Sequence, residues 1–443
     1  MVKEDDQFRL STRGANLGIE EKRIAIFQAY CPILSQQWFM AKSLCCEGFQ
    51  VDFFLHKCDT DYYEVFEEQG IRIYHVDDSG IGASQRKFQA ISNRVKRWVE
   101  RSKMLPVIIL FRAICRKIRP EFTLLAGAKL IPTTLIDEAV NVIGAGDYAC
   151  LIGVEKAGLV WAGLVGERTG LPWLYYSLEL FTSDNKFVPG PLYRFRRAEK
   201  QYHQKATATI IQDNDRADVL FKDNNIENGK ALLVPVSILG EAGEPRSNYL
   251  RAKYDIPQNK VIVLQFGQIN KRRLSDKVLL SLRDFNENVV LVMHGSFSEG
   301  KDKYVDLASD RKVILADRMV PHQEIQELIS SADIGLVFYR KKPINDCLTG
   351  SASEKLALYL QAGLPVIMFD YPSFRELNKE YQFGICIRKL EELGHAINVI
   401  TKDYPHFREN AIKAFTNHYE FGRNFVKVSE YIRNLLYVFL VFS

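Results

Sequence analysis

The chain has 443 residues, of which 47% are hydrophobic, 12% aromatic and 26% charged. These values are typical of a globular protein and exclude a disordered, collagen-like or disulfide-scaffold chain, and the length suits two or three domains. The formal net charge is only +5, whereas a dedicated nucleic-acid binder is usually strongly basic, so we expect no nucleic-acid partner.

The first half of the chain alternates short apolar runs with helical patterns. Residues 1–21 are polar and are predicted to be an N-terminal extension. The strands predicted after it are 24–27, 51–55, 71–76, 148–154, 173–177, 207–212 and 232–236, and the helices are 36–47, 158–168 and 215–224. Strands and helices that alternate through short links are typical of a parallel α/β sheet.

Positive charge is concentrated in residues 85–120, which hold eleven basic residues and one acidic residue, so that this stretch carries +10 and the remainder −5. Apolar residues recur there at three- and four-residue steps with basic residues between them, which predicts an amphipathic helix with a cationic face. One interpretation is a surface that contacts the acceptor or an anionic membrane, through Arg94, Arg97, Trp98 and Arg101. The other is a core-packed helix with a solvated polar face.

A G-x-G-x-x-A pattern at residues 144–149 raises the question of a dinucleotide site. Such a loop follows a strand and opens a helix, but here a predicted strand comes after the glycines. We therefore interpret these residues as a loop that enters strand 148–154, and we expect no cofactor.

The second half restarts the alternation after residues 240–248, which hold two Gly and one Pro and predict a linker. Strands are predicted at 261–266, 289–293, 313–316, 334–338 and 366–369, helices at 323–331 and 354–362, and long helices from about residue 410. The expected domains are the extension 1–21, an α/β domain 22–240, a second α/β domain 241–409, and C-terminal helices 410–443.

The strongest candidate for a ligand site lies between residues 332 and 369. A polar loop that contains Gly350 and Ser351 leads to Ser353, a natural N-cap, and to a predicted helix that begins Glu354-Lys355. Free N–H groups at a helix start, with hydroxyls and a lysine beside them, suit an anion such as a diphosphate. An ordinary well-capped helix explains the same residues equally well.

A second candidate follows the first strand of the second domain, where Gly267 allows a turn and Lys271, Arg272 and Arg273 come next. Ligands of open α/β sheets bind at the carboxyl ends of the strands. Both candidates lie at such ends in one domain, so they can converge on one anionic ligand. The alternative is a solvated basic turn.

The carboxyl ends of strands in the first domain carry Tyr30, Glu155 and Glu179. A carboxylate that faces a cleft there can act as a base or bind sugar hydroxyls. A helix cap or a surface position is an equally good interpretation of either glutamate.

These segments resemble the GT-B glycosyltransferases, specifically the family-four-like enzymes of bacterial polysaccharide and glycolipid assembly. The resemblance runs from about Lys22 to the C-terminus, and its best parts are Ser353-Glu354-Lys355-Leu356, Ala362-Gly363-Leu364-Pro365-Val366, Ala332-Asp333-Ile334 and Tyr175-Tyr176-Ser177-Leu178-Glu179. It implies two Rossmann-like domains that face each other across a cleft, with the last helix crossing back to the first domain.

The resemblance also implies how the chain works. The second domain would bind a nucleotide sugar, without a metal, through Lys271, Arg272 and the helix start at Ser351–Lys355, with Asp317-Arg318-Met319 near the base. The first domain would bind the acceptor, a glycan or lipid-linked sugar.

Two other hypotheses stay open. The glutamate pair usual in the family falls on Gly350 and Leu358, with Glu354 the nearest carboxylate, and Gln268 stands where an arginine is usual. A binding or scaffold protein that has lost its chemistry is therefore one alternative, and a nucleotide-sugar epimerase is the other. Eight cysteines without a C-x-x-C pair and the lack of an apolar run of about 20 residues predict a cytoplasmic protein, soluble or peripheral on the inner face of a membrane.

Overall fold

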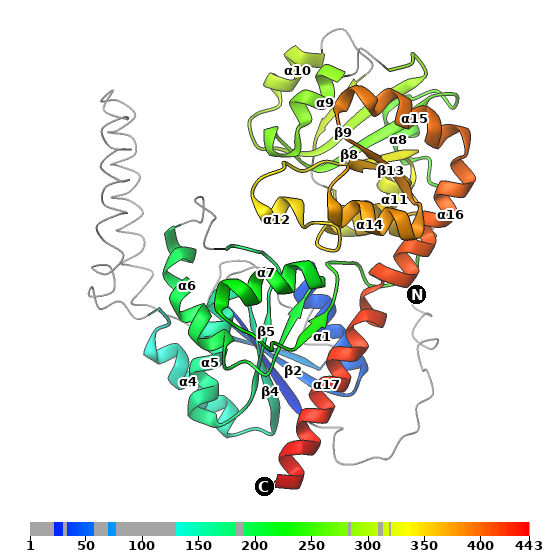
Figure 1. The fold of residues 1–443 in the computed structure, drawn as a ribbon. Helices are drawn as coiled ribbons and strands as arrows, with labels where there is room; N and C mark the ends of the chain where they lie inside the picture. Colours follow the sequence, from blue (N-terminus) through cyan, green and yellow to red (C-terminus); the bar gives the residue numbers. More distant parts are fainter. Residues whose placement is uncertain are drawn as a thin grey trace, which may run out of the picture.

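The computed structural model of the chain describes residues 22–29, 33–56, 70–76, 130–182, 190–243, 245–281, 285–308, 313–318 and 320–442. Two sheets, each with its own helices, lie one above the other in Figure 1. The predicted extension 1–21, Tyr30 and the basic stretch 85–120 fall outside the described residues.

The first domain is a seven-stranded parallel sheet in the order β3-β2-β1-β4-β5-β6-β7. Its strands are β1 (Arg23–Gln28), β2 (Gln50–His56), β3 (Ile71–Val76), β4 (Tyr148–Val154), β5 (Trp173–Tyr176), β6 (Ala208–Ile211) and β7 (Ala231–Leu233). Its helices are α1 (Ser35–Cys46), α4 (Thr133–Gly144), α5 (Glu155–Thr169), α6 (Gly190–His203) and α7 (Asn214–Asn224). The order reverses between β1 and β4, and the carboxyl edge beside that switch point is where ligands of such sheets bind.

The second domain is a six-stranded parallel sheet in the order β10-β9-β8-β11-β12-β13. Its strands are β8 (Val261–Ile269), β9 (Val289–Phe297), β10 (Val313–Asp317), β11 (Ile334–Val337), β12 (Val366–Phe369) and β13 (Gly384–Ile387). The helices around it are α8 (Tyr249–Tyr254), α9 (Ser275–Ser281), α10 (Asp302–Ala308), α11 (His322–Ser330), α12 (Ile344–Cys347), α13 (Glu354–Gln361), α14 (Pro372–Tyr381) and α15 (Leu393–Lys402), with single 3₁₀ turns at Lys271–Arg273 and Leu390–Glu392.

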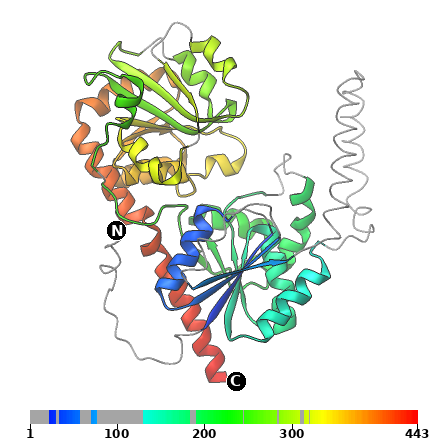
Figure 2. The same cartoon turned by 180° about the vertical axis from the view of Figure 1, so that it is seen from behind.

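The C-terminal helices return to the first domain (Figure 2). Helix α16 (Tyr404–Ala414) lies on the second domain, a π-helical turn (Phe415–Tyr419) follows, and α17 (Phe421–Phe442) packs against α1. The rings of Phe39 and Phe421 lie 5.6 Å apart, and Arg433 forms an ion pair with Glu47 at 2.5 Å. The chain thus ties the two domains together at a second point besides the linker.

Buried side chains explain why the alternation of strands and helices was readable in the sequence. Strands β1 and β4 are buried along almost all of their length, and α5, which packs on both, places Trp161 against Phe27 with ring centroids 5.3 Å apart. Strands covered on both faces read as continuous apolar runs. The predicted strands of both domains are present, and the glycines at 144–146 form the expected loop into β4.

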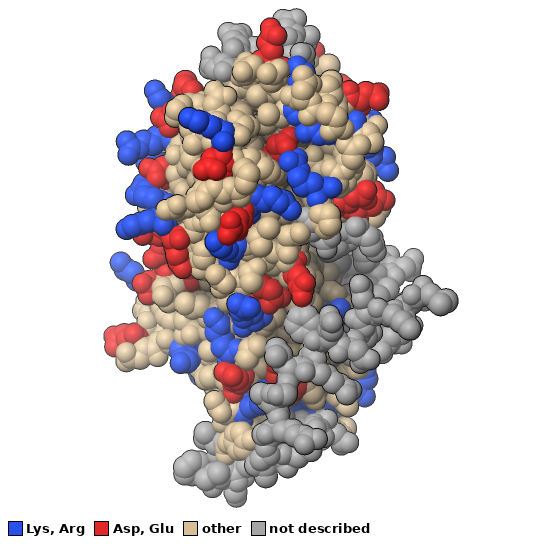
Figure 3. Space-filling model, turned by 90° about the vertical axis from the view of Figure 1, so that its right-hand side faces the viewer, with Lys and Arg blue, Asp and Glu red and all other residues tan. Residues whose placement is uncertain are grey.

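Two expectations about strands were wrong. Strand β8 does not end at Phe266 but pairs with β9 as far as Ile269, because its polar last residues still continue the backbone ladder. Strand β13 was missed because it is only four residues long and begins with a glycine. No described helix is long and apolar enough to cross a membrane. On the face in Figure 3, basic and acidic side chains are interspersed, as on an ordinary solvated surface.

Candidate active site

Two cations that the described residues leave without an acidic partner meet at the carboxyl edge of the second sheet. Arg273 ends the 3₁₀ turn after β8, and Lys355 lies in the first turn of α13. The Nη1 atom of Arg273 is buried without a hydrogen-bond partner in the described part of the chain. Burial and the neighbouring Arg273 together lower the pKa of Lys355 to about 7. Two cations held close together without a carboxylate are arranged for an anionic ligand.

Helix α13, whose first turn holds Lys355, begins with a side-chain cap. The Ser353 hydroxyl accepts a hydrogen bond from the Leu356 N–H at 3.2 Å, as the sequence predicted. The same hydroxyl lies 2.6 Å from the Tyr339 hydroxyl, and the guanidinium of Arg273 stacks over the Tyr339 ring at 4.2 Å. Tyr339 therefore fixes Arg273 beside the positive end of the helix dipole.

Gly267 brings the backbone of β8 close to Lys355. It has a φ of +96°, and a Cβ at this position would lie 3.8 Å from the Lys355 Cε. Gly295 on β9 has a φ of +144°, and its Cβ would lie 1.9 Å from the Gly267 carbonyl oxygen. Two strands can approach this closely only where neither has a side chain, so the pair of glycines shapes one wall of the site.

The other predicted cations of this turn have different surroundings. Arg272 forms a bidentate ion pair with the buried Asp346 of α12, at 2.6 and 3.1 Å. Lys271 is exposed and lines a separate cavity. The structure therefore singles out Arg273 of the three, although the sequence prediction named Lys271 and Arg272.

Gly350 and Ser351 are used in packing at the domain junction. The Gly350 carbonyl accepts a hydrogen bond from the Tyr419 hydroxyl at 2.7 Å, and the Ser351 carbonyl accepts one from the Val236 N–H at 2.8 Å. Glu354 is exposed and accepts a hydrogen bond from the Ser35 hydroxyl of α1 at 2.5 Å. These three predicted residues thus join the start of α13 to the first domain and the C-terminal helices.

Asp317 ends β10, Arg318 follows it, and both are exposed. The Asp317 carboxylate accepts a hydrogen bond from the Phe297 N–H at 3.3 Å. His294, at the same edge on β9, is fully buried, and neither ring nitrogen has a partner among the described residues. Burial, together with the charges of Lys253 and Arg318, lowers the pKa of His294 to about 4, so the ring is neutral at neutral pH.

Glu155 stands at the switch point of the first sheet, directly after β4. Its φ of +57° is a left-handed conformation that is costly for a residue with a side chain and typical of functional positions. Its Oε1 atom accepts hydrogen bonds from the Leu178 N–H at 2.7 Å and the Glu179 N–H at 2.8 Å. Burial raises the pKa of Glu155 to about 7, and the charge of Glu179 contributes. A carboxyl group with a pKa near 7 can give or take a proton at neutral pH.

Glu179 reaches across to the second domain. Its Oε2 atom accepts a hydrogen bond from the Asn345 side-chain amide at 2.7 Å, and the Asn345 carbonyl oxygen accepts one from the Leu180 N–H at 2.9 Å. The fully buried Arg216 of α7 donates to that same oxygen at 3.1 Å and to the Leu348 carbonyl at 2.9 Å. Glu179, Arg216 and Asn345 therefore connect the two domains beside both candidate sites.

Arg216 and Asn345 were missed by sequence reasoning, and Arg273 was named only as one of three cations. Nothing in the sequence distinguishes Arg273 from Arg272, because only the position of Asp346 decides which of them is already paired. Arg216 follows the predicted strand end at Gln212, and its Nε donates to the Gln212 side chain at 2.6 Å. The proximity of Arg216 to that strand end was the one signal available.

Known proteins resemble the chain in one domain by sequence and over nearly its full length by fold. Residues 281–429 match the family model of the glucosyltransferase 3-like C-terminal domain. No protein with a curated description matches the chain in sequence.

Among solved structures, sucrose-phosphate synthase from Thermosynechococcus elongatus aligns with a TM-score of 0.64 and 12% identity, over 94% of this chain and 100% of that one. Anabaena HepE in complex with UDP-glucose aligns with a TM-score of 0.60 and 11% identity, over 94% and 99%. WaaG, a glycosyltransferase involved in lipopolysaccharide biosynthesis, aligns with a TM-score of 0.55 and 14% identity, over 92% and 99%.

These matches confirm the expected fold class, GT-B, with two Rossmann-like parallel-sheet domains. The shared fold and the match of the second domain together indicate a glycosyltransferase.

Proposed function

We propose that the protein transfers a sugar from a nucleoside-diphosphate donor to an acceptor held by the first domain. The observation that carries this proposal is the pair Arg273 and Lys355, which the described residues leave without an acidic partner, at the start of α13 and beside Gly267. The diphosphate of the donor would lie against these two cations and the free N–H groups of the helix. Positive charge at this position stabilises the diphosphate as it leaves, so the reaction needs no metal ion.

The nucleotide and the sugar are proposed from the relatives. HepE binds UDP and UDP-glucose in its solved structures, and the matched family model is that of a glucosyltransferase. UDP-glucose is therefore the first donor to test. Asp317 and Arg318 are proposed to lie near the base, because they end β10 at the same edge of the sheet as Gly295.

The proposed chemistry of the first domain rests on Glu155. Its carboxyl group would take the proton of the acceptor hydroxyl or hold the hydroxyl in place, and a pKa near 7 suits the first role. Glu179 would position the acceptor and hold the second domain through Asn345. Contacts that join the domains at this point keep water from the donor.

We further propose that the acceptor is lipid-linked or otherwise close to a membrane, and that the protein works in the cytoplasm. The support is the stretch 85–120 with its charge of +10, which lies outside the described residues. Basic clusters bind anionic lipid by an electrostatic attraction that salt weakens. Cosedimentation with acidic vesicles should therefore fall as salt is raised, and binding that is absent or insensitive to salt would overturn this part.

Binding of UDP, measured by calorimetry, tests the donor site. Arg273→Gln and Lys355→Gln should each weaken UDP by about tenfold or more, because each removes a charge-assisted contact to phosphate. Lys271→Gln and Arg272→Gln test the other cations of the turn in the same assay, and Lys230→Gln, an exposed lysine of the first domain, serves as the control. Equal UDP affinity in Arg273→Gln, Lys355→Gln and the control would refute the proposed site.

Turnover separates the alternatives. Slow hydrolysis of UDP-glucose to free UDP would exclude the scaffold hypothesis, while a UDP-sugar isomer as the product would favour the epimerase. UDP that binds without any turnover, across a panel of sugars and acceptors, would favour the scaffold.

A further inference from the structure

A cavity of about 950 Å³ lies on the second domain, outside the proposed donor site. It opens where four strands of the sheet end, since its lining comes from segments that follow β8, β11, β12 and β13. Gly267, Arg273, Ser353 and Lys355 do not line it. The two sites meet at an aromatic wall, where Tyr371, which lines the cavity, donates a hydrogen bond to the Tyr339 carbonyl at 2.7 Å.

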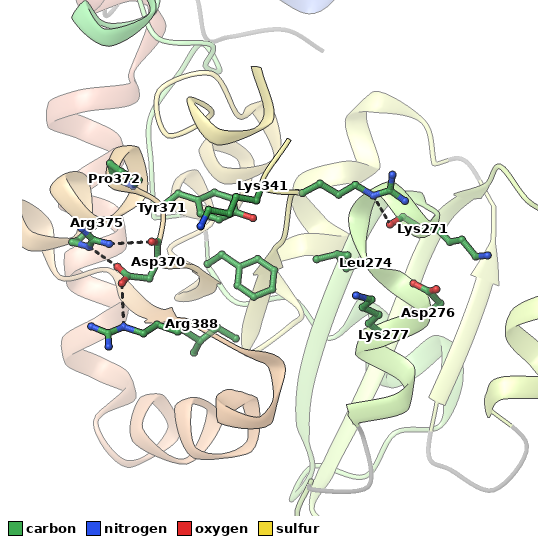
Figure 4. A pocket seen from close by; sticks show the side chains of 13 residues that line it. Lys271, Leu274, Asp276, Lys277, Lys341, Asp370, Tyr371, Pro372, Arg375 and Arg388 are labelled. Carbon is green, nitrogen blue, oxygen red and sulfur yellow. Dashed lines mark hydrogen bonds and ion pairs between the residues drawn. The ribbon is translucent and has the colours of Figure 1, made fainter. Parts of the chain in front are cut away.

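The lining of this cavity is strongly basic. Six of its side chains are cationic and two are acidic: Lys271, Lys277, Arg340, Lys341, Arg375 and Arg388 against Asp276 and Asp370. In Figure 4, Asp370 lies between two of these cations, and its ion pairs with Arg375 at 2.6 Å and Arg388 at 3.5 Å hold both guanidinium groups at the rim. These ion pairs lower the pKa of Asp370, so its charge is already matched within the protein.

The charges of the other cations in the lining are available to a ligand. Lys277 and Lys341 are exposed, and the described residues offer neither of them a carboxylate within ion-pair distance. Among the described residues, Arg340 donates a hydrogen bond to the Lys271 backbone carbonyl, at 3.3 Å, and has no ion pair. The carboxylate of Asp276 lies next to Lys277 and would repel an anion on that side of the cavity. One oxygen of Asp276 is buried without a partner among the described residues. The cavity therefore attracts anions and repels cations, with a net excess of positive charge even after Asp276 is counted.

The floor of the cavity is apolar. Phe369, Leu274 and Ile387 lie among the cations, and Tyr371 adds a second ring whose centroid is 5.8 Å from that of Phe369. A ligand that fits this lining carries both a strongly charged group and a part that packs against rings. A cluster of Lys and Arg donors suits phosphate oxygens in particular.

We propose that this cavity binds a phosphate-bearing ligand, which is separate from the nucleotide of the proposed reaction. Its phosphate would lie among the cations of the lining that have no carboxylate partner among the described residues, Lys277 and Lys341, and its remainder would lie on Phe369 and Tyr371. The source of the phosphate is either a free phosphorylated molecule or the headgroup of a lipid, because both present the same oxygens.

The test uses the full chain with UDP at a concentration that fills the donor site, and pyrophosphate is then titrated by calorimetry. Pyrophosphate should bind beside UDP, and Lys277→Gln/Lys341→Gln should weaken it by about tenfold or more. The matched control is Lys230→Gln/Lys402→Gln, which removes two exposed lysines elsewhere. If UDP does not bind, pyrophosphate is titrated into Lys355→Gln instead. This variant lacks a cation of the proposed donor site, so pyrophosphate that binds to it reports on the cavity even if the proposed donor site is wrong.

Vesicles distinguish the source of the phosphate. Cosedimentation is compared on phosphatidylcholine vesicles with and without phosphatidic acid. A loss of binding in Lys277→Gln/Lys341→Gln, but not in the control pair, would assign the cavity to a lipid headgroup. Pyrophosphate binding without any such loss would assign it to a free phosphate. If no pyrophosphate binds beside UDP and both double variants bind vesicles equally, the proposal is wrong.

Discussion

Replacing Glu155 with Gln should stabilise the first domain above pH 7 while it disables the protein. The carboxyl pKa is about 7 in the folded chain against an ordinary value of 4.5, which corresponds to about 3 kcal/mol between the two protonation states. Between these pH values the folded state binds more protons than the unfolded state, so stability falls as pH rises through the window. Gln carries no charge, and its carbonyl oxygen can still accept from Leu178 and Glu179.

The expected result is a difference in the free energy of unfolding between Glu155→Gln and the parent, and this difference should depend on pH. Below about pH 4.5 both forms are uncharged and Glu155→Gln should equal the parent; above pH 7 it should be more stable by up to about 3 kcal/mol. Urea unfolding followed by tryptophan fluorescence reports on this domain, since all four tryptophans lie between residues 22 and 240. Turnover should fall by about 100-fold or more if Glu155 is the base.

Glu227→Gln, at an exposed position of the same domain, is the control for removing a carboxylate. A stability difference that is constant with pH, or a variant less stable than the parent above pH 7, would show that Glu155 is not held at a raised pKa.

Three further predictions concern the donor site and the domain junction. UDP affinity should decline as pH rises above about 7, because Lys355 is then largely neutral in the free protein. UDP binding should therefore be accompanied by proton uptake, which calorimetry in buffers of different ionisation enthalpy measures. Lys355→Gln should remove this uptake. Gly295→Ala should lower stability by about 2 kcal/mol and weaken UDP, because its Cβ would lie 1.9 Å from the Gly267 carbonyl oxygen; Gly300→Ala, which shares a positive φ but meets nothing within 4 Å, should leave UDP binding unchanged. Arg216→Met should cost about 3 kcal/mol of stability, since it leaves the Leu348 and Leu178 carbonyls without their donor; an unchanged urea midpoint would contradict this role.

The domain plan was readable from the sequence because its strands are buried on both faces. Runs such as Tyr148–Val154 are apolar throughout, and helices with caps such as Ser353 separate them. Burial and capping are local rules, so they leave a pattern in the chain itself. For the same reason the sequence predicted the Ser353 cap of α13 correctly, and with it a candidate anion site.

Tertiary structure alone decided which charges are free to act. Lys271, Arg272 and Arg273 are equivalent in sequence, but Asp346 pairs with the second of them and the Tyr339 ring holds the third. The raised pKa of Glu155 depends on burial and on Glu179, which is 24 residues away. The cationic cavity joins the ends of four strands that are distant in the chain. Electrostatic effects depend on distance in space and on the surrounding dielectric, and neither is encoded by residue order.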